Sequence, residues 1–106
     1  IESDLVELLL AAAEGRLDDQ ELKISEQTAV TTVLVSGGYP GDYAKGYEIS
    51  FSETPPNVTV FHAGTAEKDG SVVTSGGRVL AVTALGDSLE AARAASQSAA
   101  ELITFE

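Results

Sequence analysis

The glycine-rich stretch Ser36–Tyr43, which reads Ser-Gly-Gly-Tyr-Pro-Gly-Asp-Tyr, constrains the fold more than any other part of the sequence. It directly follows Thr28–Val35, whose residues are nearly all β-branched or small and predict a strand. This strand lacks a clean alternation of apolar and polar residues, so we expect both of its faces to be covered. The glycines permit a sharp turn and a close approach by another group. Tyr39–Asp42 is typical of a type II turn, with Pro40 second and Gly41 third.

Composition excludes several classes of protein and site. The net charge is −11 in 106 residues, and an acidic domain repels nucleic acid and anionic membranes, so neither is an expected partner. The absence of cysteine excludes disulfides and zinc–thiolate sites. The length and the 43% apolar content predict one folded domain over residues 1–106. Since the sequence contains no methionine, we expect it to be part of a longer or processed protein.

A helix is predicted near each end of the chain. In the first, over Asp4–Glu14, apolar residues recur at helical spacing, Asp4 and Glu7 resemble a capping pair, and Gly15 suits the position after the helix. The last helix should start at Asp87–Ser88, with Asp87 and Glu90 as its cap. Its predicted apolar face consists of Leu89, Ala92, Ala95 or Ser96, Ala99 and Leu102 or Ile103.

The middle of the chain is rich in strand signals. Thr59–Thr65 predicts a strand, and Asp69-Gly70 predicts a tight hairpin turn into Ser71–Thr74. Gly76-Gly77 predicts a second turn into Arg78–Leu85, so that three consecutive strands form an antiparallel meander.

Two weaker strand signals complete the pattern, at Leu22–Glu26 and at Ile103–Phe105. The predicted fold class is α+β: a small antiparallel sheet or half-barrel, similar to a barrel-sandwich, flanked by an N-terminal and a C-terminal helix.

The sequence contains no known catalytic motif, and its candidate binding sites are three glycine-bearing turns. No phosphate-binding P-loop or dinucleotide-binding glycine pattern occurs, and the lone His62 is expected to be a packed, hydrogen-bonded residue. The three glycine-bearing turns are Gly37–Gly41, Ala63–Thr65 and Gly76–Arg78. Backbone amides at such turns can hold a phosphate or a carboxylate, or the glycines can serve only to turn the chain. Ser-Gly-Gly occurs at Ser36 and again at Ser75, which we interpret as coincidence.

Three separated motifs resemble one family. Ser36–Tyr43 with Lys45-Gly46, then Val60–Thr65, then Gly76–Ala84 are similar to the C-terminal domain of phosphoribosylamine–glycine ligases, also called glycinamide ribonucleotide synthetases. The likeness runs over essentially the whole chain, and Glu2–Leu5 resembles the segment that leaves the preceding ATP-grasp domain. The resemblance implies that residues 1–15 are a helix leaving that domain.

The resemblance also implies an activity and its ligands. The intact enzymes join glycine to phosphoribosylamine through glycyl phosphate, with ATP and Mg²⁺ (or Mn²⁺), in cytoplasmic purine synthesis. Most nucleotide contacts and the metal ligands would belong to the missing ATP-grasp domain, so no catalytic or metal-binding residue is assigned to this chain, which should be inactive alone. Its partners would be the missing domains and the small-molecule substrates. The residues expected to face the cleft and position phosphoribosylamine are Gly37, Gly38, Tyr39, Pro40, Gly41, Asp42, Gly64, Thr65, Gly77 and Arg78.

Two other functions are compatible with the residues. A carrier or interaction module would use a lysine at an exposed hairpin tip, and Lys68 lies beside the Asp69-Gly70 turn. A structural domain of another ATP-grasp ligase would use the same glycines only to build turns and an inter-domain contact.

Overall fold

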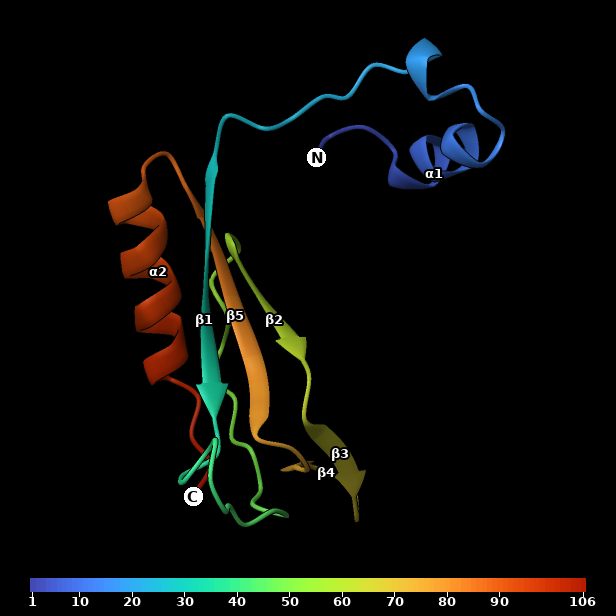
Figure 1. The fold of residues 1–106 in the computed structure, drawn as a ribbon. Coiled ribbons are helices and arrows are strands. Elements are labelled where there is room, and N and C mark those ends of the chain that lie inside the picture. The colour runs from blue at the N-terminus through green and yellow to red at the C-terminus, as the bar shows by residue number, and fades with distance from the viewer.

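Five strands form two small antiparallel sheets in the computed structural model, which describes residues 1–106 (Figure 1). The larger sheet has the order β1-β5-β2, and the smaller one pairs β3 with β4. Their bounds are β1 Thr28–Val35, β2 Val58–His62, β3 Thr65–Lys68, β4 Ser71–Thr74 and β5 Arg78–Gly86. With a helix near each end, this confirms the predicted α+β class. Neither helix is long and apolar enough to cross a membrane.

Strand β1 has the predicted bounds, but the expectation that both of its faces are covered is wrong. Its residues alternate between half-buried and exposed along the whole strand. The half-buried side chains of Val30, Thr32 and Leu34 face α2 (Leu89–Glu101), and those of Thr31 and Val33 lie on the open side. The lack of alternation in the sequence arose because threonine and valine occupy both faces.

Helix α2 covers one face of the larger sheet at close range. Its buried residues are Ala92, Ser96, Ala99 and Ala100, whose small side chains let the helix backbone approach. A Cβ added at Gly86 would lie 2.6 Å from the amide nitrogen of Ala92. Two details of the prediction are wrong, because Ser88 rather than Asp87 caps the helix and Leu89 is mostly exposed. Of the alternatives Leu102 and Ile103, it is Ile103 that packs against the core.

The predicted three-strand meander is also wrong. Strands β2 and β3 form one arm of a long hairpin and β4 and β5 form the other, with a break in each arm. The expected single strand Thr59–Thr65 is therefore interrupted after His62, and Gly76-Gly77 lies in a break rather than in a hairpin turn. The Asp69-Gly70 turn is confirmed, with positive φ at both residues (52° and 82°), as a two-residue hairpin turn requires.

Residues 48–50, which precede β2, form isolated bridges with β4 and with the C-terminal segment of the chain. Glu48 pairs with Val73 of β4, and Ser50 pairs with Thr104 in a second isolated bridge. The strand predicted at Ile103–Phe105 is thus reduced to one bridged residue. These contacts bury Ile49 beside Val79 and Leu80.

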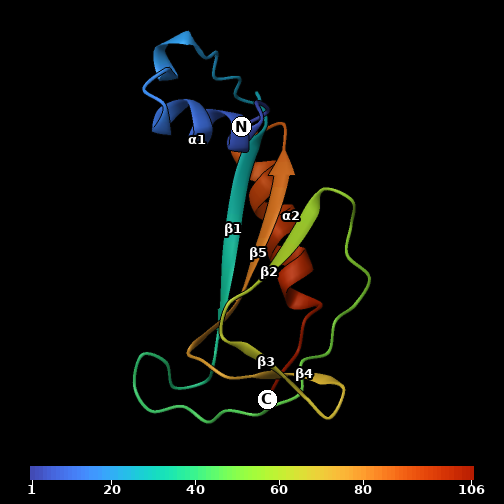
Figure 2. The same ribbon diagram turned by 90° about the vertical axis from the view of Figure 1, so that its right-hand side faces the viewer.

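Residues 1–27 form an arm that stands apart from the sheets. Helix α1 (Leu5–Ala13) begins at the predicted cap, Asp4, and ends before Gly15, whose φ is +70°. A short 3-10 helix, η1 (Leu17–Asp19), follows, and the strand predicted at Leu22–Glu26 is absent. Figures 1 and 2 show α1 beyond the Thr28 end of β1, on the side of the sheet opposite α2. The radius of gyration is 17.4 Å, whereas a compact chain of this length has about 13 Å.

Candidate functional site

A glycine kink joins the two sheets. The two sheets end at the pairs His62–Leu80 and Thr65–Thr74 of the long hairpin. Between these pairs, the two residues 63–64 lie opposite the five residues 75–79. The Gly64 N–H donates to the Arg78 carbonyl (2.8 Å), and the Gly64 carbonyl accepts from the Gly76 N–H (3.1 Å). A Cβ at Gly64 would lie 2.6 Å from that Arg78 oxygen and 2.7 Å from the Gly76 Cα. The two arms can approach this closely only because glycine has no side chain.

The Ser36–Tyr43 loop is attached to the same kink. The buried Ser36 donates its N–H to the Gly77 carbonyl (2.8 Å) and its Oγ–H to the Gly76 carbonyl (3.0 Å). The two Ser-Gly-Gly segments, 36–38 and 75–77, therefore contact each other. The repetition, interpreted from the sequence as coincidence, thus brings together two segments that form one unit in space.

The turn inside this loop differs from the predicted one. A type II turn over Tyr39–Asp42 requires positive φ at Gly41, but the positive φ (+94°) belongs to Gly38, and the Tyr39–Pro40 peptide is cis. The Tyr39 N–H donates to the Ser36 carbonyl (3.0 Å), which places the turn three residues earlier, with Gly38 third.

The aromatic ring of Tyr39 lies against the backbone of Gly77. A Cβ added at Gly77 would come within 2.6 Å of the Tyr39 Cε2. Tyr39 also meets Tyr43 edge-on, with ring centroids 6.2 Å apart, and the Lys45 ammonium lies 5.7 Å from the Tyr43 ring centre. The ring of Tyr39 thus connects the Ser36–Tyr43 loop to the glycine kink, and it forms one wall of the hollow that opens beside them.

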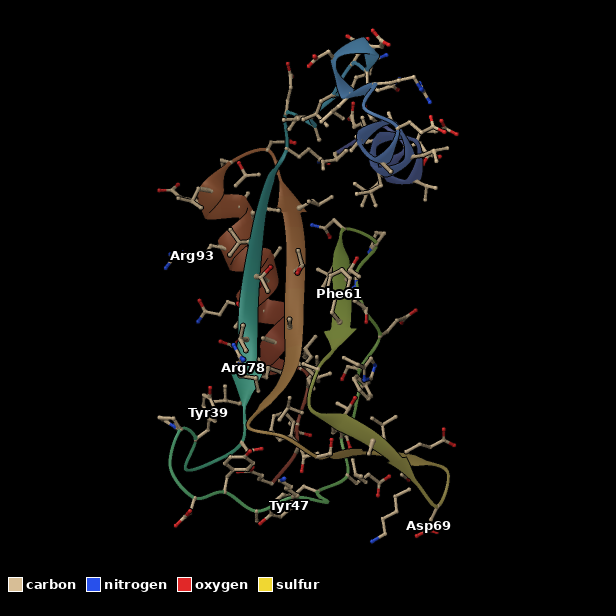
Figure 3. All side chains as sticks on the ribbon, turned by 45° about the vertical axis from the view of Figure 1, so that its right-hand side comes forward. Tyr39, Tyr47, Phe61, Asp69, Arg78 and Arg93 are labelled. Carbon is tan, nitrogen blue, oxygen red and sulfur yellow. The ribbon has the colours of Figure 1, made fainter.

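A hollow of about 610 Å³ opens where the loop, the kink and the larger sheet meet. It is lined by Val33, Tyr39, Ala63, Gly64, Gly77, Arg78, Leu80 and Ala81. Figure 3 shows Tyr39 and Arg78 near the same end of the sheet. Four of the predicted site residues, one or more from each glycine motif, are therefore brought together in this hollow.

The other predicted site residues lie around the hollow rather than in its lining. Gly37, Gly38, Pro40, Gly41 and Asp42 belong to the exposed loop. The half-buried Thr65 pairs its Oγ1 with the Nδ1 of His62 (3.1 Å). His62 is thus hydrogen-bonded as predicted, and its ring lies beside that of Phe51 with centroids 5.7 Å apart, but the residue is exposed to solvent.

Gly37 shows that this loop can bind an anionic group. Its N–H donates to both carboxylate oxygens of Glu106, at 2.9 and 3.0 Å. The expectation that backbone amides of this turn suit a carboxylate or phosphate is met here by a carboxylate of the chain itself.

Arg78 is a cation without a partner of its own. Its guanidinium makes no ion pair or hydrogen bond. The two ion pairs of the chain, Arg16–Glu14 and Lys23–Glu21, both lie in residues 1–27. In a chain of net charge −11, a free guanidinium at the edge of a hollow favours an anionic ligand. No three His, Asp or Glu side chains are arranged to hold a metal ion.

Sequence reasoning missed the sheet residues that line the hollow. Val33 and Ala81 are paired across β1 and β5 on the face away from α2. Reading β1 as alternating would have separated Val33 from the residues that face α2.

Comparison with known proteins agrees with this arrangement. Residues 29–106 match the family "Phosphoribosylglycinamide synthetase, C domain". A phosphoribosylamine–glycine ligase of Caldanaerobacter subterraneus is 43% identical over the whole of this chain, which covers 25% of that protein. A phosphoribosylamine–glycine ligase of Vibrio cholerae is 50% identical over 96% of this chain, which covers 24% of that protein. The crystal structure of a phosphoribosylamine–glycine ligase from Thermotoga maritima matches 94% of this chain with 25% of its own (TM-score 0.74, 36% identity).

A fusion protein matches as well. A bifunctional purine biosynthetic protein of Schizosaccharomyces pombe is 47% identical over the whole chain, which spans 14% of that protein. The chain spans about a quarter of the length of the single-function relatives above. The match over residues 29–106 covers both sheets and α2, and leaves out the arm that stands apart. The chain therefore belongs to the family of phosphoribosylglycinamide synthetase C domains.

Proposed function

We propose that this chain is the C-terminal domain of a phosphoribosylamine–glycine ligase of de novo purine synthesis. The intact enzyme transfers the γ-phosphoryl group of ATP to the glycine carboxylate, which gives glycyl phosphate and ADP. The amine of phosphoribosylamine then attacks the acyl carbon, phosphate leaves, and glycinamide ribonucleotide forms. The domain alone carries no complete site for this chemistry.

One observation carries the proposal beyond family membership. Tyr39, Gly64, Gly77 and Arg78 come from three motifs separated along the chain and line one hollow, whose edge holds a free guanidinium. Phosphoribosylamine carries a phosphate monoester, and the planar guanidinium fork matches phosphate oxygens.

The hollow is proposed to wall the active-site cleft on the side of the phosphoribosylamine. Arg78 binds the phosphate, the Tyr39 ring bounds the ribose, and the loop amides near Gly37 add donors for an anion. The remaining loop residues, Gly38, Pro40, Gly41 and Asp42, hold this wall in shape, and Thr65 fixes the start of β3 through His62.

ATP and its magnesium ion are assigned to the preceding ATP-grasp part of the parent. A cytoplasmic location is proposed with it, although one relative, from Arabidopsis thaliana, is named as chloroplastic.

The test is steady-state kinetics of ADP release by the intact parent protein with freshly made phosphoribosylamine. Arg78→Ala should raise the apparent KM for phosphoribosylamine about tenfold or more, because a charge-assisted hydrogen bond is lost. Arg93→Ala is the matched control, since Arg93 is also an exposed arginine but lies on α2 and points away from the sheet (Figure 3). It should leave KM unchanged. Equal KM values for Arg78→Ala and the parent would remove Arg78 from the site.

The carrier alternative has its own check. A carrier module would show a covalent adduct on Lys68, which sits at the exposed end of β3. The mass of the Lys68 peptide from natively expressed parent protein should equal the unmodified value, and an added prosthetic group there would favour the carrier function.

A further inference from the structure

One side chain of the C-terminal segment reaches the Ser36–Tyr43 loop. The Gly37 N–H donates to both carboxylate oxygens of Glu106, at 2.9 and 3.0 Å, although the two residues are 69 positions apart. A Cβ added at Gly37 would lie 2.5 Å from one of these oxygens, so the carboxylate lies directly against the loop backbone. In Figures 1 and 2, the C-terminus lies at the same end of the molecule as the loop that follows β1.

The backbone that carries Glu106 is itself fixed to the domain. The Ser50 N–H donates to the Thr104 carbonyl (2.9 Å), and the Thr104 N–H donates to the Ser50 carbonyl (3.2 Å). Phe105 packs against the buried cluster that contains Leu80, a residue that also lines the hollow. The Glu106 carboxylate is therefore presented to the loop from an anchored segment.

The loop has few other attachments to the rest of the chain. Ser36 is hydrogen-bonded to the glycine kink, and the Gly46 N–H donates to the last residue of β4 (2.7 Å). Between these two points, the Gly37 N–H is the only group that is hydrogen-bonded to another part of the chain. The other attachment is the ring of Tyr39, which lies against the backbone of the kink.

The contact between Glu106 and Gly37 therefore bears on one wall of the hollow. Tyr39 lies two residues after Gly37, and its ring lines the hollow. Without the carboxylate, the loop would be held between Ser36 and Gly46 only by the packing of this ring. The loop could then move away from the kink and take the wall with it.

We propose that Glu106 is a positioning residue for phosphoribosylamine, because its carboxylate holds Gly37 and thereby keeps the Tyr39 ring in the wall of the hollow. The inference rests on the proposed function. Glu106 does not line the hollow, so it acts through the loop and not on the substrate. The Gly38 N–H makes no hydrogen bond within the chain and is left as a donor for an anionic ligand.

Hydrogen–deuterium exchange of the intact parent tests whether Glu106 holds the loop. In the peptide that spans Ser36–Tyr43, Glu106→Ala should speed the exchange of protected amides by about tenfold, because a charge-assisted hydrogen bond is lost. Glu106→Gln keeps an oxygen acceptor without the charge and should lie between Glu106→Ala and the parent. Glu90→Ala is the control, since it removes the same charge from the exposed face of α2 and should leave this peptide unchanged. Exchange in Glu106→Ala as slow as in the parent would overturn the proposal.

The kinetics of ADP release test whether the contact positions the substrate. Glu106→Ala should raise the apparent KM for phosphoribosylamine about threefold or more at a nearly unchanged kcat, and Glu90→Ala should not raise it. Loss of a negative charge near an anionic substrate would by itself lower KM, so the expected change is opposite to the electrostatic one. A fall in KM would show that the carboxylate competes with the substrate phosphate for Gly37, and either a fall or no change would contradict positioning.

A double variant tests the route through Tyr39. If Glu106 acts by placing this ring, Tyr39→Ala combined with Glu106→Ala should have the same KM as Tyr39→Ala alone. Multiplication of the two single effects would contradict this route, because a general loss of structure would add to the loss of the ring.

The exchange experiment uses no substrate, so it is independent of the proposed activity. Faster exchange of the loop in a Glu106→Ala parent that lacks ligase activity would retain the contact and reject the function. An active ligase whose loop exchange does not respond to Glu106→Ala would reject the role of Glu106 alone.

Discussion

At two positions the site requires glycine because the neighbouring atoms leave no room for a side chain, and not because the backbone adopts a positive φ. Gly64 and Gly77 lack the positive φ of Gly38 or Gly70, yet neither has room for a side chain. At Gly64 the obstacle is backbone of the opposite arm, and at Gly77 it is the movable ring of Tyr39. The two positions should therefore respond differently to the same substitution.

Gly64→Ala should strongly destabilise the domain. The added Cβ would meet the Arg78 carbonyl and the Gly76 Cα, and neither can move without opening the kink. We expect the free energy of unfolding to fall by about 3 kcal/mol or more, the upper end of overpacking costs. Urea unfolding of the intact parent measures it, and a loss near zero would show that the kink relaxes freely.

Gly77→Ala should instead displace Tyr39. The ring can rotate away, so the stability loss should be about 1 kcal/mol, while the wall of the hollow moves. The apparent KM for phosphoribosylamine should rise severalfold with little loss of stability. Ser98→Ala is the control, since Ser98 lies on the exposed face of α2 and does not line the hollow. The same KM for both variants would contradict the role of Tyr39.

Among the elements, those specified by local sequence were predictable and those that depend on distant partners were not. The eight residues of β1, the Asp69-Gly70 turn and the Asp4 cap follow from neighbouring residues alone. The meander failed because β5 pairs with β1 and β2 rather than with β4, which no local signal reveals. That the three glycine motifs meet at one site could be predicted only from the family resemblance. That Val33 and Ala81 line the hollow could not be predicted without the pairing register of β1 and β5.

The packing of α2 on the sheet depends on one buried hydroxyl. Ser96 is fully buried, donates to the Val82 carbonyl (2.8 Å) and pairs with the Thr32 hydroxyl (2.7 Å). Ser96→Ala should lower the free energy of unfolding by about 1–3 kcal/mol, because it leaves the Thr32 hydroxyl without its partner.

Two further variants separate this hydrogen bond from helix propensity. Ser96→Ala combined with Thr32→Val should recover part of the loss, since both polar groups are then removed. Ser98→Ala on the exposed face of α2 should change stability by less than about 0.5 kcal/mol. A double variant no better than Ser96→Ala alone would show that the loss arises elsewhere.

At the scale of the whole molecule, the larger sheet is covered by a helix on one side only. One face of the sheet is covered by α2 and the other is open, and the arm extends the chain to 49 Å along its longest axis. The sequence predicted a single domain over residues 1–106, whereas the match to the family begins at residue 29.

ADP release by the intact parent protein, with each substrate omitted in turn, tests most directly whether this chain completes a phosphoribosylamine–glycine ligase. With ATP, Mg²⁺, glycine and freshly made phosphoribosylamine together, we expect sustained ADP formation, and without glycine or without the amine we expect only background. Release that needs neither substrate, or that requires a different acid or amine, would contradict the assignment.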